Sequence, residues 1–340
     1  MLNPFDWSGT ASRKQYWTIF IVWFLASIGT GYLLLSGVQA THLFKYSLIA
    51  VAVLQSVFLT AIVRRLHDIG RTGLWAVLLA VPYLGLPFIL VIVFLKSRIE
   101  QSTLWPSRKR HRVGQFAALI FVGLAVSRLF WAPYWIPSGS MKPTLLVGDY
   151  LASPIGADNT TPKRGEVFVL QHPANGTAYV GRLIGLAGDT VQMVDGAVVL
   201  NGTPLVRKRV EDFTEINGFQ GPRQSLPRCA NGAVGVGAIC IKGQFVETLP
   251  DETSYRILDI QGSQLDNTGR YTVPDGHLFF LGDNPDNSND SRVPANMRGL
   301  GFVPVENLIG QPKVIVFSFS GQSWWQFWNW RSDRSFKPVQ

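Results

Sequence analysis

Two serine hydroxyls within one short motif are the groups of this chain best suited to nucleophilic chemistry. Residues 137–141 read Pro-Ser-Gly-Ser-Met and are followed by Pro-Thr-Leu at 143–145 and Gly-Asp at 148–149. A serine oxygen attacks a carbonyl carbon once a base takes its proton. Pro137 and Gly139 favour an irregular backbone that a substrate can approach closely, and the Ser138 hydroxyl with the Ser140 N–H would suit a developing oxyanion. Ser-Gly-Ser alone is more typical of a simple turn, whereas the complete run favours a catalytic serine.

A second polar motif lies far along the chain, where residues 282–292 read Gly-Asp-Asn-Pro-Asp-Asn-Ser-Asn-Asp-Ser-Arg. Its carboxylates could be those of a calcium loop. Counted from Asp286, however, the sixth position is Ser291 instead of glycine and the twelfth is Met297 instead of glutamate. We therefore expect no metal here and no cofactor elsewhere in the chain.

A third motif, Tyr-Val-Gly-Arg-Leu-Ile-Gly-Leu-Ala-Gly-Asp at 179–189, completes a resemblance. Together the three motifs resemble the bacterial signal peptidase I family of membrane-bound serine endopeptidases, which use a Ser/Lys dyad. The resemblance covers Arg112 to about Phe319. It implies that Ser140 is the nucleophile and that Ser138 and the Ser140 N–H form the oxyanion hole. Where the family has its general-base lysine, this chain has Gly181.

The resemblance also implies residues that support the catalytic pair and residues that bind the substrate. Ser288 would hydrogen bond the base, and the ion pairs that support the site would come from Arg182, Asp283, Asp290 and Arg292. Ile136 and Val180 would line the small pockets for the alanine-like residues that precede the cleavage point. The chain departs from the family again at Pro285, where an arginine is usual.

The glycine at position 181 leaves open which group takes the proton from Ser140. A lysine acts as a base only where burial lowers its pKa, by as much as about 3–5 units, and glycine offers no such group. Lys142 would lie on the same side as Ser140 if the chain is extended there. His172 and His277 are further candidates, although each is more typical of a structural or solvated position. The remaining alternative is a water molecule in the space left by the missing lysine.

Long apolar runs set the first 130 residues apart from the rest. Of the 340 residues, 47% are hydrophobic and 16% are charged. Uncharged runs at Tyr16–Val38 and Tyr46–Val63 are long enough, or nearly so, to cross a hydrocarbon core of about 30 Å. Two further runs lie at Leu74–Leu95 and from Val113 to about Phe130. Two prolines and a glycine interrupt Leu74–Leu95, which favours a re-entrant hairpin but leaves a single crossing open.

Basic residues indicate the orientation of these runs in a membrane. The net charge is +9, and residues 108–112 read Arg-Lys-Arg-His-Arg directly before the last run. A nucleic-acid partner is not expected, because no nucleic-acid-binding module accompanies the cluster and the positive-inside rule already explains it. The pattern predicts a multi-pass protein of the bacterial inner membrane, with the residues beyond Phe130 on the periplasmic side.

Residues 1–96 carry a signature of their own, Arg-Arg-Leu-His-Asp-Ile-Gly-Arg-Thr-Gly at 64–73. This segment resembles an uncharacterised family of small bacterial inner-membrane domains, a resemblance that implies no chemistry. We expect a membrane-embedded helical domain at 1–96, a basic cytoplasmic linker at 97–112 and a transmembrane anchor at 113–130.

Beyond Trp131 the chain changes to short β-branched and aromatic runs separated by turn residues. Thr190–Val194 and Ala197–Leu200 flank Asp-Gly, which predicts a two-residue hairpin. Other expected strands lie at Val167–Leu170, Leu278–Leu281 and Val314–Phe317. With no long helical period, we expect a mostly β domain at 131–320 and an aromatic-rich tail at 321–340.

The chain has two cysteines, Cys229 and Cys240, and both fall in the segment expected outside the cytoplasm. Two cysteines without a nearby histidine make a poor zinc site, so the pattern favours a disulfide. Aromatic runs at 131–135 and 324–330 suit a domain that rests on a membrane surface, although some of these rings could equally belong to a core.

The sequence thus predicts a multi-domain chain with an α-helical transmembrane amino-terminal domain and a mostly β periplasmic catalytic domain. Its expected function is the removal of amino-terminal signal peptides from exported preproteins, with those signal peptides and membrane lipid as partners. Because of Gly181, an alternative is a pseudopeptidase that binds signal peptides or pilin-like segments as a chaperone or assembly factor. A third alternative makes the amino-terminal domain a membrane sensor or adaptor that the β domain serves.

Overall fold

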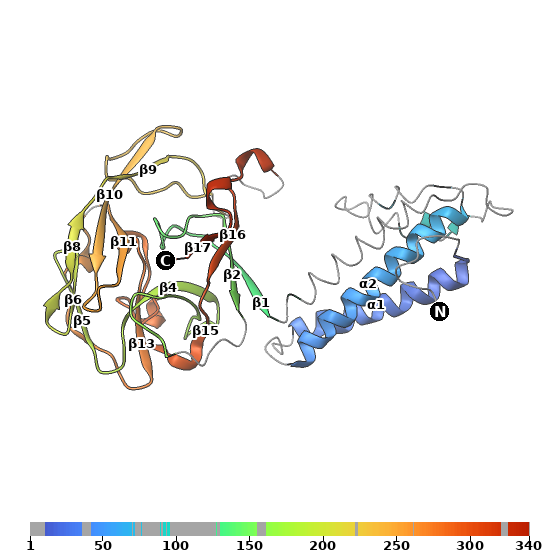
Figure 1. Ribbon diagram of the computed structural model, residues 1–340, viewed down its shortest axis with the longest axis horizontal. Coiled ribbons are helices and arrows are strands. Elements are labelled where there is room, and N and C mark those ends of the chain that lie inside the picture. Colours follow the sequence, from blue (N-terminus) through green and yellow to red (C-terminus); the bar gives the residue numbers. More distant parts are fainter. Residues whose placement is uncertain are drawn as a thin grey trace. The chain divides into compact units, whose positions relative to one another are not determined.

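The computed structural model describes residues 11–35, 42–69, 71, 76, 89, 91–92, 94–95, 127, 130–154, 161–221, 224–260, 262–320 and 326–339. The chain divides into two compact units, Met1–Phe130 and Trp131–Gln340, which we call the helical unit and the β unit (Figure 1). The expected linker at 97–112 lies outside the described residues, as does most of the expected anchor at 113–130.

The helical unit contains α1 (Arg13–Leu35) and α2 (His42–Asp68). Aromatic residues hold the two helices together: the rings of Trp23 and Phe58 stack with centroids 4.5 Å apart, and Tyr16 packs on Phe58 at 5.8 Å. The Trp23 indole N–H also donates to Gln55 Oε1 at 2.5 Å. The two helices therefore bury their aromatic faces against each other.

The expected runs Tyr16–Val38 and Tyr46–Val63 largely coincide with α1 and α2, so the helical part of that prediction is confirmed. Among the described residues, however, neither helix is both long and apolar enough to cross a bilayer. Hydroxyl side chains interrupt the apolar character of α1, where Ser27 and Thr30 donate to the carbonyls of Trp23 and Ala26. The membrane-spanning part of the prediction is thus not supported by α1 or α2.

The β unit is built from short strands, and this confirms the expectation of a multi-domain chain with a mostly β second part. The strands are β1 (Trp131–Trp135), β2 (Asp149–Pro154), β3 (Val167–Gln171), β4 (Ala178–Gly185), β5 (Thr190–Val194), β6 (Ala197–Leu200), β7 (Thr203–Pro204), β8 (Val206–Arg209), β9 (Phe213–Ile216), β10 (Ile239–Thr248), β11 (Ser254–Asp259), β12 (Tyr271–Thr272), β13 (His277–Leu281), β14 (Val303–Pro304), β15 (Leu308–Gly310), β16 (Val314–Ser318) and β17 (Lys337–Pro338). Single-turn 3-10 helices lie at Gln264–Asp266, Pro285–Asn287, Ala295–Met297, Val305–Asn307, Phe327–Asn329 and Ser332–Arg334.

These strands form antiparallel sheets with the orders β1-β2-β16-β17, β14-β13-β4-β3-β15, β12-β5-β6-β7 and β11-β10-β8, with β9 also paired to β10. Figure 1 shows β1, β2 and β16 on one side of the β unit and β5, β6 and β8 on the other. The predicted hairpin joins β5 to β6, and Asp195 and Gly196 both have positive φ, 46° and 76°. A two-residue turn of this hand matches the right-handed twist of its strands.

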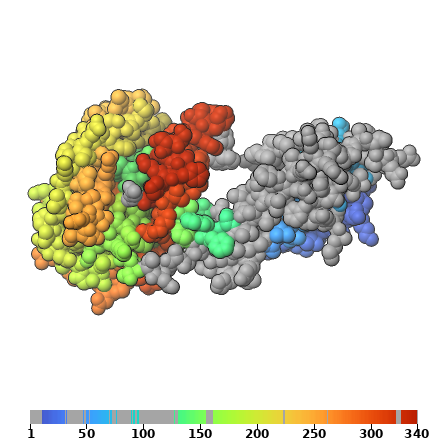
Figure 2. Space-filling model, viewed as in Figure 1, coloured from blue at the N-terminus to red at the C-terminus, as the bar shows by residue number. Residues whose placement is uncertain are grey.

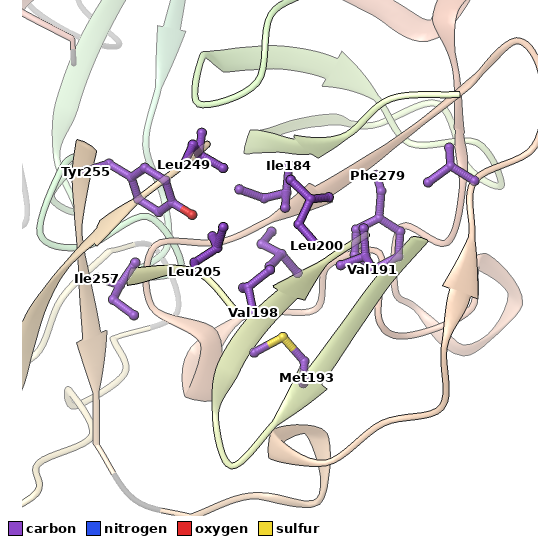
Figure 3. Close-up of a cluster of buried hydrophobic side chains, with 12 residues drawn as sticks. Ile184, Val191, Met193, Val198, Leu200, Leu205, Leu249, Tyr255, Ile257 and Phe279 are labelled. Atoms are coloured by element: carbon purple, nitrogen blue, oxygen red, sulfur yellow. The ribbon is translucent and has the colours of Figure 1, made fainter. Parts of the chain in front are cut away.

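The main core of the β unit fills the space between β5–β6 and the strands that face them. Val191, Met193 and Val198 are 1–2% exposed and pack with Ile184 of β4 and Phe279 of β13. Figure 3 shows these side chains directed toward one another. Ile184 belongs to the strand that carries Gly181, and Phe279 to the strand that leads to Gly282. This core therefore fixes the position of two of the sequence motifs.

A second anchor joins the end of the chain to the start of the β unit. Asp149 is fully buried and accepts hydrogen bonds from Ser318 Oγ at 2.6 Å, Arg334 Nη2 at 2.6 Å and the Leu146 N–H at 2.8 Å. Figure 2 shows the C-terminal segment, in red, on the face of the β unit turned to the viewer. Arg334 therefore ties this segment to the strand that follows the Ser140 motif.

Replacing Asp149 by alanine is expected to lower the free energy of unfolding by about 3–5 kcal/mol, because Arg334 would keep a buried charge without its partner. Asp212 provides a matched control, since it pairs with Arg209 at the surface, where both side chains are more than a third exposed. Asp212→Ala should cost no more than about 1 kcal/mol. Urea unfolding of the two variants measures the difference, and equal losses would contradict the assignment.

Candidate active site

The Ser140 motif forms a compact turn between β1 and β2. The Lys142 N–H donates to the Gly139 carbonyl at 3.3 Å, the Leu145 N–H donates to the Met141 carbonyl at 2.8 Å, and we call Ser138–Leu145 the nucleophile turn. Ser138 Oγ and Ser140 Oγ lie 3.2 Å apart. Ser138 is exposed and Ser140 is half-buried, so a hydroxyl pair faces solvent where a peptide can reach it.

Asn284 holds the nucleophile turn through two hydrogen bonds. Its N–H donates to the Ser140 carbonyl and its Nδ2 donates to the Gly139 carbonyl, both at 2.9 Å. The sequence analysis did not single out Asn284, although it belongs to the 282–292 motif. With both carbonyls engaged, the peptide planes around Ser140 are fixed.

The Ser140 N–H donates to no protein acceptor within the described part of the chain. A fixed, unpaired N–H beside a second hydroxyl is the arrangement that stabilises negative charge on a carbonyl oxygen during acyl transfer. The expectation that Ser138 and the Ser140 N–H form an oxyanion hole stays a prediction, with which this geometry is compatible.

Arg182 and Asp283 form a buried ion pair beneath this turn. Arg182 Nε and Nη2 donate to the two Asp283 oxygens, each at 2.7 Å, and both side chains are at most 2% exposed. Burial disfavours the charged guanidinium, but the attraction of Asp283 outweighs it and raises the pKa of Arg182. Thr144 Oγ1 donates to Asp283 at 2.5 Å and accepts from Arg182 Nη2 at 3.2 Å. The pair therefore joins the nucleophile turn to β4 and β13.

A second buried pair shapes the 282–292 loop. Arg292 donates to both oxygens of Asp290, at 2.8 and 2.9 Å, and its Nη2 donates to the Pro285 carbonyl at 2.7 Å. Asp290 in turn accepts from the Gly282 N–H at 3.2 Å. Pro285, which departs from the family pattern, is thus held through its carbonyl oxygen.

Ser288 and the Ser140 backbone meet at Gly282. A Cβ added at Gly282 would stand 2.6 Å from the Ser140 carbonyl oxygen and would also collide with Ser288 Oγ. Only glycine fits this position, because any side chain would push the 282–292 loop away from the nucleophile turn.

Gly181 lies in the interior of β4, close to the end of β13. A Cβ at this position would stand 3.2 Å from Phe280 Cβ and 3.6 Å from the Leu281 carbonyl oxygen, just before Gly282. Position 181 therefore faces the end of β13, next in the chain to Gly282, and it has no side chain to take a proton.

Ile136 and Val180, the expected substrate-binding residues, belong to one hydrophobic cluster. Ile136 is 3% exposed and forms this cluster with Met141 and Leu145 among others, and the partly buried Val180 packs against the cluster. The fold thus brings the two residues together from β4 and from the end of β1, next to the nucleophile turn.

Lys142 does not lie on an extended segment with Ser140, which corrects the expectation drawn from strand alternation. The chain turns there, and the Lys142 side chain is 3% exposed. Its Nζ donates to Glu215 Oε2 at 2.5 Å and to Gln220 Oε1 at 2.8 Å. Burial and the nearby Lys242 lower the pKa of Lys142 to about 8, against the opposing attraction of Glu215.

The two histidines named as possible bases have hydrogen-bond partners other than Ser140. His172 is buried beside the Tyr179 ring, with centroids 5.1 Å apart, and its Nδ1 accepts from the Ala174 N–H. The His277 ring contacts the Asp275 carbonyl at 2.9 Å. Within the described residues, neither histidine hydrogen bonds Ser140.

Cys229 and Cys240 form a disulfide that closes the glycine-rich stretch between them. The nearby 217–228 segment reaches the site: a Cβ at Gly221 would stand 2.6 Å from the Pro137 carbonyl oxygen, and the Arg228 guanidinium donates to the Asp286 carbonyl. In the described part of the chain, no group of three or more His, Cys, Asp or Glu side chains is arranged to hold a metal ion.

A buried carboxyl group behind the Arg182–Asp283 pair escaped the sequence analysis. Glu247 is 2% exposed and accepts from Tyr255 OH at 3.0 Å, while the Arg182 guanidinium lies 4.5 Å from the centre of the Tyr255 ring. Glu247 and Tyr255 line a small internal pocket with Arg182 and Asp283. Burial raises the pKa of Glu247 from 4.5 to about 7, although the Tyr255 hydrogen bond opposes this shift.

This raised pKa predicts a pH-dependent stability. Between pH 4.5 and about 7 the folded chain keeps a proton on Glu247 that the unfolded chain releases, so stability is lost as the pH rises through this window. At pH 8 the wild type should have lost about 3 kcal/mol of its free energy of unfolding through Glu247, and Glu247→Gln should not show this loss. Urea unfolding of both proteins from pH 4.5 to 8 measures the difference, with the exposed Glu252→Gln as control. Parallel curves for wild type and Glu247→Gln would contradict it.

Comparison with known proteins identifies relatives for both parts of the chain. Residues 109–317 match the family described as "Signal peptidase, peptidase S26", and residues 4–103 match "Protein of unknown function (DUF805)". The signature at 64–73 remains a prediction within the second match.

Similar proteins include three from Rickettsia species. Signal peptidase I of Rickettsia typhi is 32% identical over 245 residues, which cover 64% of this chain and 83% of that protein. The enzyme named Signal peptidase I from Rickettsia prowazekii gives the same identity and coverage. That of Rickettsia canadensis is 33% identical over 239 residues, with 62% and 80% covered.

Among solved structures, a signal peptidase I from Enterococcus faecalis is 24% identical and covers 45% of this chain and 97% of its own. Its TM-score of 0.23 is too low to support an argument about the fold. The family match spans more than half of the chain and includes the nucleophile turn, Gly181 and the 282–292 loop. This chain is therefore a member of the signal peptidase family, peptidase S26.

Proposed function

We propose that the β unit is a serine endopeptidase that removes signal peptides from exported preproteins, with Ser140 as its nucleophile. The observation that carries the proposal is the pair of hydroxyls at Ser138 and Ser140, 3.2 Å apart in a turn whose carbonyls Asn284 holds. Family membership supports the same assignment.

In this mechanism Ser140 Oγ attacks the carbonyl carbon of the scissile peptide. The Ser138 hydroxyl and the Ser140 N–H then donate to the oxygen on which negative charge develops. The buried Arg182–Asp283 pair keeps the turn in place through Thr144. Asn284 prevents the Ser140 peptide from rotating, so the oxyanion donors are positioned before substrate binds.

The proposed substrate-binding residues are apolar side chains beside the nucleophile turn. Ile136 and Val180 share a cluster with Met141 and Leu145, which suits small apolar residues better than charged ones. Gly181 adds no side chain to this surface, and a Cβ there would stand 3.2 Å from Phe280 Cβ, against β13. Peptides with alanine-like residues before the cleavage point are therefore the proposed substrates.

An oxidising compartment and a membrane surface fit the exterior of the β unit. Disulfides such as Cys229–Cys240 persist in the periplasm and are rare in the cytosol. Trp131 is 42% exposed, and Phe327 and Trp328 are 70% and 67% exposed. Amphipathic rings of this kind are favoured at a lipid interface. We therefore place the β unit on the periplasmic side of the inner membrane, with lipid as a partner; Trp324 and Trp325 lie outside the described residues.

One observation favours a second candidate function. Gly181 cannot accept a proton, and loss of a general base costs about 10²–10⁴-fold in rate. An oxyanion hole and substrate binding alone still supply roughly 10³–10⁴ over water. A pseudopeptidase that binds signal peptides or pilin-like segments, as a chaperone or assembly factor, would use the same pocket without cleaving.

Cleavage of a preprotein with alanines before its cleavage point separates the two functions. Full-length protein in detergent should release the signal peptide, and Ser140→Ala should abolish the release. Ser138→Ala should lower kcat by about 10²–10³-fold, because one oxyanion donor is lost. The exposed Ser254→Ala is the matched control and should leave the rate unchanged. Product formation is measured by gel electrophoresis and mass spectrometry.

Gly181→Lys gives the deciding comparison. Its Cβ needs Phe280 to yield by only a few tenths of an ångström, so the variant should fold. Release by the wild type supports the peptidase. If the wild type binds the signal peptide without cleaving it and Gly181→Lys cleaves, the pseudopeptidase is correct.

A further inference from the structure

Two lysines and one glutamate form a buried cluster beside the nucleophile turn. Lys142 and Lys242 are 3% and 1% exposed, and both Nζ atoms donate to the Glu215 carboxylate, one to each oxygen. Phe213–Ile216 pairs with Ile239–Lys242 in β9 and β10, which places Glu215 and Lys242 close together. The cluster does not include the Arg182–Asp283 or Asp290–Arg292 pairs.

Charge balance in this cluster favours a neutral amine. One carboxylate compensates only one ammonium, and water does not stabilise a second charge at a buried position. The groups that act on Lys142 are Glu215 from β9, Lys242 from β10 and, at longer range, Arg331 from the C-terminal segment. Burial and the two like charges outweigh Glu215, and the pKa of Lys142 falls to about 8. A substantial fraction of the amine is therefore unprotonated in mildly alkaline solution.

The Lys142 side chain folds back along the nucleophile turn. A Cβ placed on Gly139, the residue before Ser140, would stand 3.4 Å from Lys142 Cε and 3.5 Å from Cδ. The amine donates to Gln220. The next residue, Gly221, lies against the Pro137 carbonyl oxygen. Its immediate partners therefore border the Ser138–Ser140 turn, and its four-carbon arm is flexible.

We propose that Lys142 is the general base for Ser140 and that it takes over the role for which Gly181 has no side chain. The inference rests on the proposed endopeptidase function. In the free enzyme the amine is held by Glu215 and Gln220; on substrate binding it exchanges the Gln220 contact for Ser140 Oγ. Such an exchange is compatible with the free structure, because catalytic hydrogen bonds often tighten only in the substrate complex.

The proton balance of each step is then defined. Neutral Lys142 Nζ takes the Ser140 hydroxyl proton while Oγ bonds to the scissile carbon and the carbonyl π electrons move to its oxygen. Collapse of this intermediate breaks the C–N bond, and the ammonium returns its proton to the departing amine. In deacylation, Nζ takes a proton from water, whose oxygen attacks the ester. The same proton then passes to Ser140 Oγ as the signal peptide leaves.

The test compares two lysines of one cluster. Lys142→Met and Lys242→Met each leave a single lysine with Glu215, so both keep a balanced buried charge. Lys142→Met should lower kcat/KM by about 10²-fold or more and should remove the limb near pH 8 from the pH–rate profile. Lys242→Met removes the like charge that lowers the pKa of Lys142. In the pH–rate profile of Lys242→Met, the limb that reports Lys142 should therefore move to higher pH. This variant should lose activity at neutral pH and regain it in more alkaline solution.

Two further variants separate a failed inference from a failed function. Gly181→Lys combined with Lys142→Met should cleave, which would show that the Lys142→Met protein is folded and lacks only a base. Cleavage that requires Ser140 but survives in Lys142→Met overturns the inference and leaves the peptidase function intact. Equal losses in Lys142→Met and Lys242→Met, with no shift in either limb, also overturn it. If the wild type fails to cleave at any pH while Gly181→Lys succeeds, the inference and the peptidase function both fall.

Discussion

The buried pair between Arg182 and Asp283 holds the active site together. Three segments far apart in the sequence meet there: β4, the end of β13 and the nucleophile turn, which joins through Thr144. Removing one partner of such a pair leaves an unpaired charge in a low-dielectric interior, which usually costs about 3–5 kcal/mol. The position of the nucleophile turn relative to β4 therefore depends on a buried pair of charges. Asn284 and Asp290 then fix the peptide groups around this pair.

The same region contains two kinds of buried charge. Arg182 and Arg292 each have a carboxylate of their own and stay charged. Lys142 and Lys242 share Glu215 instead. An amine that shares its counter-ion loses its proton more easily than one with a full partner. We therefore distinguish two structural ion pairs, each with its own carboxylate, from the undercompensated amine of Lys142, which shares Glu215 with Lys242.

Strand β9 and the segment that follows it bring this undercompensated amine its partners. Cys229–Cys240 closes the segment after β9, and the 217–228 segment packs against Pro137 and the Asp286 carbonyl. Glu215 of β9 and Gln220 of the segment after it hold the Lys142 amine, so the proposed chemistry at Ser140 draws on residues outside the main core.

Local sequence signals were sufficient for the motifs and for several strands of the β unit. Turn residues and β-branched runs predicted the β5–β6 hairpin and the strands at 167, 278 and 314, because these preferences act between neighbours in the chain. The Ser140 motif and the 282–292 motif were recognised by their resemblance to a known family, for which contiguous residues suffice. Only the tertiary structure placed Lys142 in a turn, paired it with Glu215 across 73 positions and buried Glu247 behind Arg182. Such positions depend on which strands pair and on which charges share a buried space, and those long-range energies leave no local pattern in the sequence.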